Sequence, residues 1–112
     1  MTKQINFITL KIDLTESTIQ VSVINKQKKE EFIHLNSNNL NNYPLNITFN
    51  NNEIIYCQQE LTENTITNFI QELFTNPTEY KRYSFTYQNK EYNVLAETLL
   101  ILIINEFKNK VD

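Results

Sequence analysis

The strongest constraint on the fold is a pair of alternating apolar and polar runs that flank one short polar turn near the start of the chain. Before the turn, every second residue is apolar, at Ile8, Leu10, Ile12 and Leu14. After it, the alternation resumes at Ile19, Val21 and Val23. A two-residue period is typical of a strand with one buried face. The sequence therefore predicts an antiparallel hairpin turned within residues 12–18, with Asp13 at the end of its first strand.

The chain contains no glycine in 112 residues, which limits how its turns are built. Glycine adopts positive φ angles at little steric cost and lets the backbone approach a ligand closely. Without it, positive φ angles are expected to fall to Asn or Asp, the next most tolerant residues. A loop that needs bare backbone against a ligand is excluded.

Further alternating runs predict more strands, joined by turns rich in asparagine. The predicted strands are Glu31–Leu35, Leu45–Phe49 with Glu53–Tyr56 as a second hairpin, and a third hairpin through Tyr83, Phe85, Tyr87, Tyr92 and Val94. The predicted turns are the loop 36–42, Asn50-Asn51-Asn52 in left-handed conformations, and Asn89-Lys90. The tyrosines of the third hairpin are interpreted as strand filler and not as a platform for stacking bases.

From Thr62 the apolar residues change to a helical period. They fall at Ile66, Phe69, Ile70, Leu73 and Phe74. Asn64 or Thr65 is expected to cap the start of this helix, and Asn76-Pro77 to end it.

A second helix is predicted from about Leu95 to Lys108, and its apolar residues cover about 200° of the helical wheel, roughly twice what a surface helix needs. Its apolar run, Leu99–Ile104, falls far short of the ~20 residues of a membrane span. Such a helix needs cover on two sides, either from two sheets of its own domain or from a partner protein. The expected partner face is Leu100, Ile101 and Ile104.

The length allows one domain, spanning residues 1–112, and the order of the predicted strands and helices indicates the α/β class, of the α+β-like kind. A net charge of −3 gives no case for nucleic acid. The basic cluster Lys26, Lys28 and Lys29 is followed at once by Glu30 and Glu31, as expected of a solvated turn. No signal peptide opens the sequence, so a cytoplasmic location is expected.

No catalytic or metal-binding constellation is predicted, and no cofactor. His34 lies in a strand pattern without a paired Asp, Ser or Cys motif. Cys57, the one cysteine, excludes an internal disulfide and a cysteine zinc site and is expected to pack as a small apolar residue. Glu60, Glu63 and Glu72 are interpreted as solvated surface.

The order of these elements resembles the first lobe of the nucleotide-binding domain of Hsp70 chaperones, which belong to the actin-like ATPase superfamily with its ribonuclease H-like fold. The resemblance covers nearly the whole chain. The strings that carry it are, in order, Ile12-Asp13-Leu14 with Ser17 and Val21-Ser22-Val23, Tyr43-Pro44 with Ile47-Thr48-Phe49, Asn64-Thr65-Ile66 with Phe69-Ile70-Gln71-Glu72-Leu73, and Tyr92-Asn93-Val94 before the last helix.

The departures from the family pattern concern nucleotide binding. Where the family's phosphate loop has Asp-Leu-Gly-Thr-Thr, this chain has Asp13, Leu14, Thr15, Glu16 and Ser17. A like charge about 4 Å from a phosphate costs on the order of 4 kcal/mol at an effective dielectric constant near 20, so the Glu16 carboxylate is expected to repel a nucleotide.

Two further positions bear on the same chemistry. The family's lysine near the γ-phosphate corresponds to Gln71, so its charge is lost. Asp13 is retained, either to order magnesium waters or merely to end a strand or cap a turn.

The resemblance and its departures lead to one expectation and two alternatives. We expect a non-catalytic, degenerate lobe that binds protein, as a subunit or modulator of a chaperone- or ribosome-associated assembly. A split ATPase completed by a partner chain is the enzyme alternative. An unrelated small α+β binding module is the third.

Overall fold

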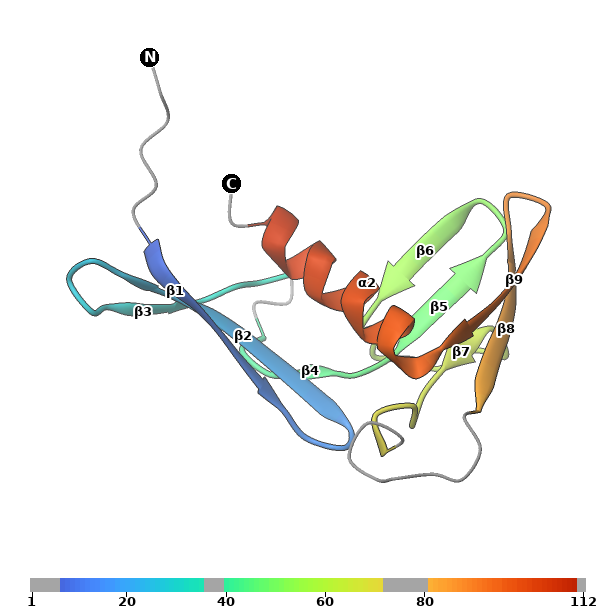
Figure 1. Cartoon of the computed structure of the whole chain (residues 1–112), viewed down its shortest axis with the longest axis horizontal. Coiled ribbons are helices and arrows are strands. Elements are labelled where there is room, and N and C mark those ends of the chain that lie inside the picture. The colour runs from blue at the N-terminus through green and yellow to red at the C-terminus, as the bar shows by residue number, and fades with distance from the viewer. Residues whose placement is uncertain (1–6, 36–39, 72–80, 111–112) are drawn as a thin grey trace, which may run out of the picture.

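The computed structural model describes residues 7–35, 40–71 and 81–110, and within them it shows antiparallel sheets followed by one C-terminal helix (Figure 1). The strands are β1 (Phe7–Leu14), β2 (Thr18–Asn25), β3 (Glu30–Phe32), β4 (Tyr43–Pro44), β5 (Ile47–Asn50), β6 (Glu53–Tyr56), β7 (Thr65–Ile66), β8 (Arg82–Tyr87) and β9 (Lys90–Leu95), and the helix is α2 (Ala96–Asn109). Each pairing among these strands is antiparallel. The chain is therefore a small α+β protein, as the alternating runs predicted.

The first sheet is built around β2, which confirms the predicted opening hairpin and third strand. β1 pairs with one side of β2, while β3 and β4 pair with opposite ends of its other side. Ile19 and Val21 of β2 are fully buried, as their alternation predicted. β3 is shorter than expected, but the Ile33 amide still donates to the Val21 carbonyl at 2.8 Å.

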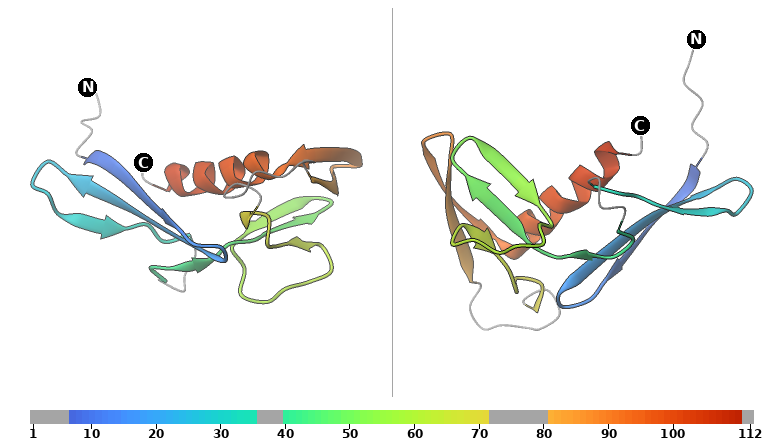
Figure 2. Two further views of the ribbon diagram at one scale, coloured as in Figure 1. Left: turned by 60° about the horizontal axis from the view of Figure 1, so that its bottom comes forward. Right: turned by 180° about the vertical axis from the view of Figure 1, so that it is seen from behind.

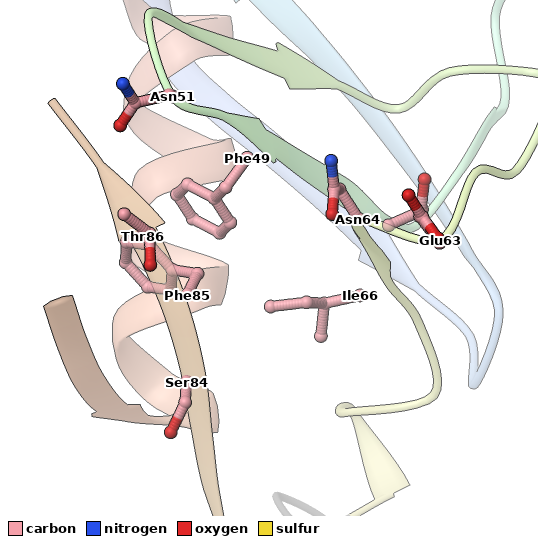
Figure 3. A pocket seen from close by; sticks show the side chains of 9 residues that line it. Phe49, Asn51, Glu63, Asn64, Ile66, Ser84, Phe85 and Thr86 are labelled. Atoms are coloured by element: carbon pink, nitrogen blue, oxygen red, sulfur yellow. The ribbon is translucent and has the colours of Figure 1, made fainter. Parts of the chain in front are cut away.

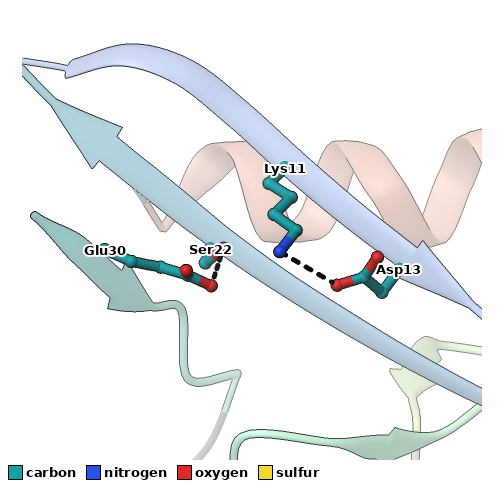
Figure 4. A network of polar contacts seen from close by, with 4 residues as sticks. All are labelled: Lys11, Asp13, Ser22 and Glu30. Carbon is teal, nitrogen blue, oxygen red and sulfur yellow. Dashed lines mark hydrogen bonds and ion pairs between the residues drawn. The ribbon is translucent and has the colours of Figure 1, made fainter. Parts of the chain in front are cut away.

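A buried hydroxyl on β2 obtains its hydrogen bond from the neighbouring strand. Ser22 is 2% exposed, and its Oγ donates to a carboxylate oxygen of Glu30 at 3.0 Å (Figure 4). A buried polar group without a partner costs about 1–3 kcal/mol, so this bond offsets the burial of Ser22.

The second sheet has the order β6-β5-β7 and corrects the predicted middle helix. Thr65 and Ile66 do not cap and begin a helix; they form a strand opposite Thr48 and Ile47. The Thr48 and Thr65 hydroxyls bond at 2.8 Å. Two β-branched residues thus complete a buried strand edge, and this tertiary pairing overrides the helical period.

The rest of the predicted middle helix falls mostly outside the described residues. Phe69 and Ile70 are fully buried, and Gln71 is helical. Leu73, Phe74, Asn76 and Pro77 lie in the segment 72–80, beyond the described part of the chain.

Positive φ angles occur at more residue types than the sequence predicted. Asn68 and Asn89 fit the expectation, but Lys28, Cys57 and Gln88 also have positive φ, between 52° and 63°. The second hairpin turns as expected, yet its asparagines are not among the positive-φ residues. Tertiary hydrogen bonds hold several of these strained residues, because the chain has no glycine to place there.

The third sheet is the predicted third hairpin, β8-β9, and its turn is Gln88-Asn89, one residue earlier than expected. Both turn residues have positive φ, as a type I′ turn requires. The Phe85 ring stacks on Phe49 of β5 at 3.5 Å and on Tyr92 at 5.2 Å between centroids. The hairpin therefore packs through its aromatic face, in agreement with the interpretation of the tyrosines as strand filler.

Helix α2 begins and ends within one residue of its predicted bounds and lies across the sheets (Figure 2). Its fully buried face consists of Ala96, Leu99, Ile103 and Phe107. The Phe107 ring meets Tyr43 edge-on at 5.7 Å between centroids. On the remaining surface, Leu100, Leu102 and Ile104 are partly buried against the same core. Ile101 is 56% exposed, so the described strands cover the helix incompletely.

We predict that Phe107→Ala lowers the free energy of unfolding by about 3–5 kcal/mol, because it removes a fully buried ring. Ile101→Ala, on the opposite side of the same helix, is expected to change it by less than about 0.5 kcal/mol. Urea denaturation followed by circular dichroism measures both. Equal losses for the two variants would contradict the described orientation of α2.

Candidate functional site

The turn between β1 and β2 is closed by the side chain of Thr15. Its Oγ1 accepts hydrogen bonds from the Ser17 amide at 3.3 Å and the Thr18 amide at 2.9 Å, and it lies 2.6 Å from the Thr18 hydroxyl. The Thr15 amide itself donates to the Thr18 carbonyl at 3.0 Å. Three of these four contacts join Thr15 directly to Thr18, and so they tie the two ends of the turn to each other.

These bonds bear directly on phosphate binding. Phosphate loops hold an anion through several backbone N–H groups that converge on it. Here the amides of Thr15, Ser17 and Thr18 already have partners inside the turn. Glu16, at the tip, is exposed and adds a carboxylate. The turn thus presents negative charge where an anion site would need donors.

Asp13 lies at the end of β1, as predicted, and forms an ion pair with Lys11. The Lys11 Nζ is 3.7 Å from an Asp13 carboxylate oxygen, on the outer face of the strand (Figure 4). Both side chains are about half exposed, at 47% and 58%, so the pair contributes little to stability. Within the described residues, no three His, Cys, Asp or Glu side chains gather closely enough to hold a metal ion.

Gln71, which the sequence resemblance would align with a lysine, is exposed. The segment that ends there returns toward the side of the molecule where the β1–β2 turn lies (Figures 1 and 2). An amide in this region supplies no positive charge for a phosphoryl group. Glu72 lies outside the described residues.

The contacts of His34 and Cys57 are those of residues that stabilise the fold. The His34 Nδ1 donates to the Leu40 carbonyl at 2.9 Å, across the loop that follows β3. His34 also lines a pocket of about 270 Å³ with Lys110 and the end of β3. Cys57 is fully buried, and its amide donates to the Asn46 carbonyl at 2.9 Å. Burial raises the pKa of the Cys57 thiol to about 12, which leaves it protonated and unreactive at neutral pH.

The remaining charged residues singled out in the sequence lie on the surface. Glu60 and Glu63 are exposed, as are Lys26, Lys28 and Lys29 in the turn between β2 and β3. Within the described part of the chain, none of these residues forms an ion pair or a hydrogen bond with Asp13 or Glu16.

The predicted partner face lies on α2 and is partly exposed. Ile101 and Leu61 are the large apolar residues most exposed in the described chain, at 56% and 63%. Leu100 and Ile104 flank Ile101 and are half-buried. At 100° per residue, these three lie on one side of the helix, and Ile101 points almost directly away from the buried residues.

The sequence did not predict a pocket of about 430 Å³ between β5, β7 and β8. Phe49, Ile66 and Phe85 extend into it, and Ser84 and Thr86 lie along β8 at its other wall (Figure 3). Its residues come from three separate parts of the chain. No local pattern could have indicated it.

An asparagine pair holds the two walls of this pocket together at one end. The Asn51 Nδ2 donates to the Asn89 Oδ1 at 2.9 Å, and the Asn89 amide donates to the Asn51 Oδ1 at 2.8 Å. The Gln88 amide also donates to the Asn51 carbonyl at 2.6 Å. The turns of the second and third hairpins are thereby fixed side by side, while the strands below them diverge around the pocket.

No family model matches the chain, and no curated protein matches its sequence. In the described part of the chain, no helix is long and apolar enough to span a bilayer.

We predict that wild-type stability falls relative to Cys57→Ala as the pH rises from 9 toward 12. The thiol pKa is about 12 in the folded protein against an ordinary value of 9.0, so the folded state holds this proton more tightly than the unfolded state. Its contribution is complete below pH 9 and is lost as the pH approaches 12. Urea denaturation of both proteins across this range measures the difference. Tyr56, whose pKa burial also raises, is common to both and cancels. Parallel pH curves would contradict the burial of the thiol.

Proposed function

We propose that this chain is a reduced, non-catalytic lobe of the Hsp70 type that works by binding protein. It would act as a subunit or modulator of a larger assembly, of the chaperone- or ribosome-associated kind. The observation that carries the proposal is the outward apolar face of α2, centred on Ile101, which is 56% exposed.

The β1–β2 turn supports the non-catalytic half of the proposal. In the Hsp70 resemblance this turn corresponds to a phosphate loop, yet the amides of Thr15, Ser17 and Thr18 are engaged within it. Binding a phosphate there would require breaking those bonds. It would also place the anion near the Glu16 carboxylate, a repulsion on the order of 4 kcal/mol at about 4 Å.

The α2 face supports the binding half. Leu100, Ile101 and Ile104 span about 100° of the helix, from the half-buried Leu100 and Ile104 to the exposed Ile101, with Glu97 and Lys108 exposed beside Ile101. An apolar centre with charged neighbours is the usual composition of a protein interface. Exposed Ile101 has no role in the core, since the fully buried residues of α2 face the other way.

The split-ATPase alternative is favoured by one observation, the Asp13 carboxylate, which is exposed beside the turn. A partner chain would then have to supply the phosphate-binding amides and the positive charge that Gln71 does not provide. The amides of the turn are already bonded within it, and Gln71 carries no charge. Both features favour a binding function over this alternative.

A photo-cross-linking experiment tests the proposal. A photoreactive residue at position 101, in the full chain added to a cell extract rich in ribosomes and chaperones, is expected to give one discrete protein adduct. The same residue at Lys26, on the distant β2–β3 turn, is expected to give none. Unlabelled wild-type chain should compete the adduct away, and Ile101→Asp should fail to do so.

Two results of this experiment would contradict the proposal. Identical adducts from positions 101 and 26, or equal competition by wild type and Ile101→Asp, would show that α2 does not select a partner. Because Ile101 is exposed, the Asp variant is expected to stay folded, which its circular dichroism spectrum checks.

A further inference from the structure

Strand β8 has one edge that no described strand pairs with. β8 is bonded to β9 on one side, and the two strands form a sheet of their own. Its other edge faces the pocket between β7 and β8 (Figure 3). An unpaired strand edge presents backbone donors and acceptors that another strand can use.

The hairpin register identifies the free backbone groups. In a two-residue type I′ hairpin the residues that flank the turn, here Tyr87 and Lys90, form a hydrogen-bonded pair. Pairs alternate along an antiparallel ladder, so Ser84 and Thr86 occupy positions that do not bond to β9. Their N–H and C=O groups point away from β9, toward the pocket that their side chains line.

The opposite wall offers a further acceptor. Asn64 and Ile66 face β5, since the Phe49 amide donates to the Asn64 carbonyl at 3.3 Å and Ile47 pairs with Ile66. By the same alternation Thr65 turns its C=O away from β5, while its amide is bonded to Thr62 at 3.1 Å. Thr65 lines the same pocket as Ser84 and Thr86.

The side chains of the pocket define what would fit between them. Phe49, Ile66 and Phe85 make an apolar floor, and Glu63 is the only charged residue among the described residues that line the pocket. A volume of about 430 Å³ is within the usual range for binding pockets. The charge favours a basic group on the occupant, and the floor favours an aliphatic side chain.

Another sheet edge in the molecule is less suited to pairing. β1 lies at the edge of the first sheet, but the exposed ion pair of Lys11 and Asp13 sits on it. Charged residues of this kind are a common protection against edge pairing. On β8 the corresponding exposed residues along the pocket are Ser84 and Thr86, which are small and uncharged.

We propose that the β8 edge and its pocket bind an extended peptide segment of a partner protein, which adds to the sheet as a strand antiparallel or parallel to β8. The segment bonds to the backbone of Ser84 and Thr86, places an aliphatic side chain on Phe49 and Ile66, and carries a Lys or Arg near Glu63. This is peptide recognition by strand addition, in which the main chain supplies affinity and alternate side chains supply specificity. The site is separate from the α2 face and does not depend on it.

The probe is a phage-displayed library of random dodecapeptides selected on the full chain. Selected peptides are expected to share an aliphatic residue and a nearby basic residue. In fluorescence anisotropy titrations, N-methylation of a selected peptide at successive residues should weaken binding at least tenfold at every second position only. That two-residue period is specific to strand pairing, because N-methyl groups on the outward amides leave the ladder intact.

Two variants at equivalent hairpin positions locate the site. Ser84→Pro removes an outward N–H from the β8 edge without breaking a bond to β9, and it should weaken binding at least tenfold. Asn93→Pro is the matched control, since Asn93 is opposite Ser84 and turns its amide to the far edge of β9. It should leave binding unchanged. Glu63→Gln, at an exposed side chain, should weaken basic peptides several-fold even if a proline variant does not fold.

Several results would overturn the proposal. They are failure to enrich any peptide, uniform or absent sensitivity to N-methylation, and equal binding by Ser84→Pro and Asn93→Pro with Glu63→Gln also unchanged. Dimerisation of the wild type that Ser84→Pro abolishes would assign the edge to a second copy of this chain instead. Unchanged peptide binding by Ile101→Asp is expected, so failure of the α2 proposal and failure of this one are distinguishable.

Discussion

The chain contains no glycine, so every residue carries a Cβ atom. The turns therefore depend on hydrogen bonds from short polar side chains. Thr15 accepts two amides in the β1–β2 turn, and the Asn25 Oδ1 accepts the Gln27 and Lys29 amides after β2. Asn46 is buried and exchanges two bonds with Gln58 at 2.9 Å, beside the positive φ of Cys57. In the β1–β2 turn, these hydrogen bonds occupy the amides of Thr15, Ser17 and Thr18. A phosphate bound at this turn would need the same amides.

The local patterns predicted most of the elements and failed where tertiary pairing decides. The opening hairpin, the third hairpin and α2 follow from strict periods of two and 3.6 residues, and their bounds agree closely with the structure. Thr65-Ile66 shows the limit: the segment fits a helical period, yet its pairing with β5 makes it a strand. The left-handed conformation of Cys57 was equally beyond prediction, because burial and a hydrogen bond from its amide to the distant Asn46 carbonyl hold it.

The two candidate sites also differ in how far the sequence could predict them. The outward side of α2 could be predicted because a helix wheel needs only one segment, and Ile101 is indeed exposed. The pocket beside β8 could not, because it joins residues near 49–51, 63–66 and 84–86 through the Asn51–Asn89 bonds. Together they give the molecule two surfaces of different character, an apolar helix face and an open strand edge, with no donor-rich anion site between them among the described residues.

A nucleotide titration observed residue by residue shows whether the β1–β2 turn is closed to phosphate. In ¹⁵N-correlated NMR spectra of the full chain, the amide signals of Asp13 through Thr18 are followed as magnesium-ATP is added to millimolar concentration. If the turn is closed to phosphate, these signals do not move beyond a salt-matched control. Saturable shifts confined to this turn would mean that its internal hydrogen bonds yield to the nucleotide and that the turn binds phosphate after all.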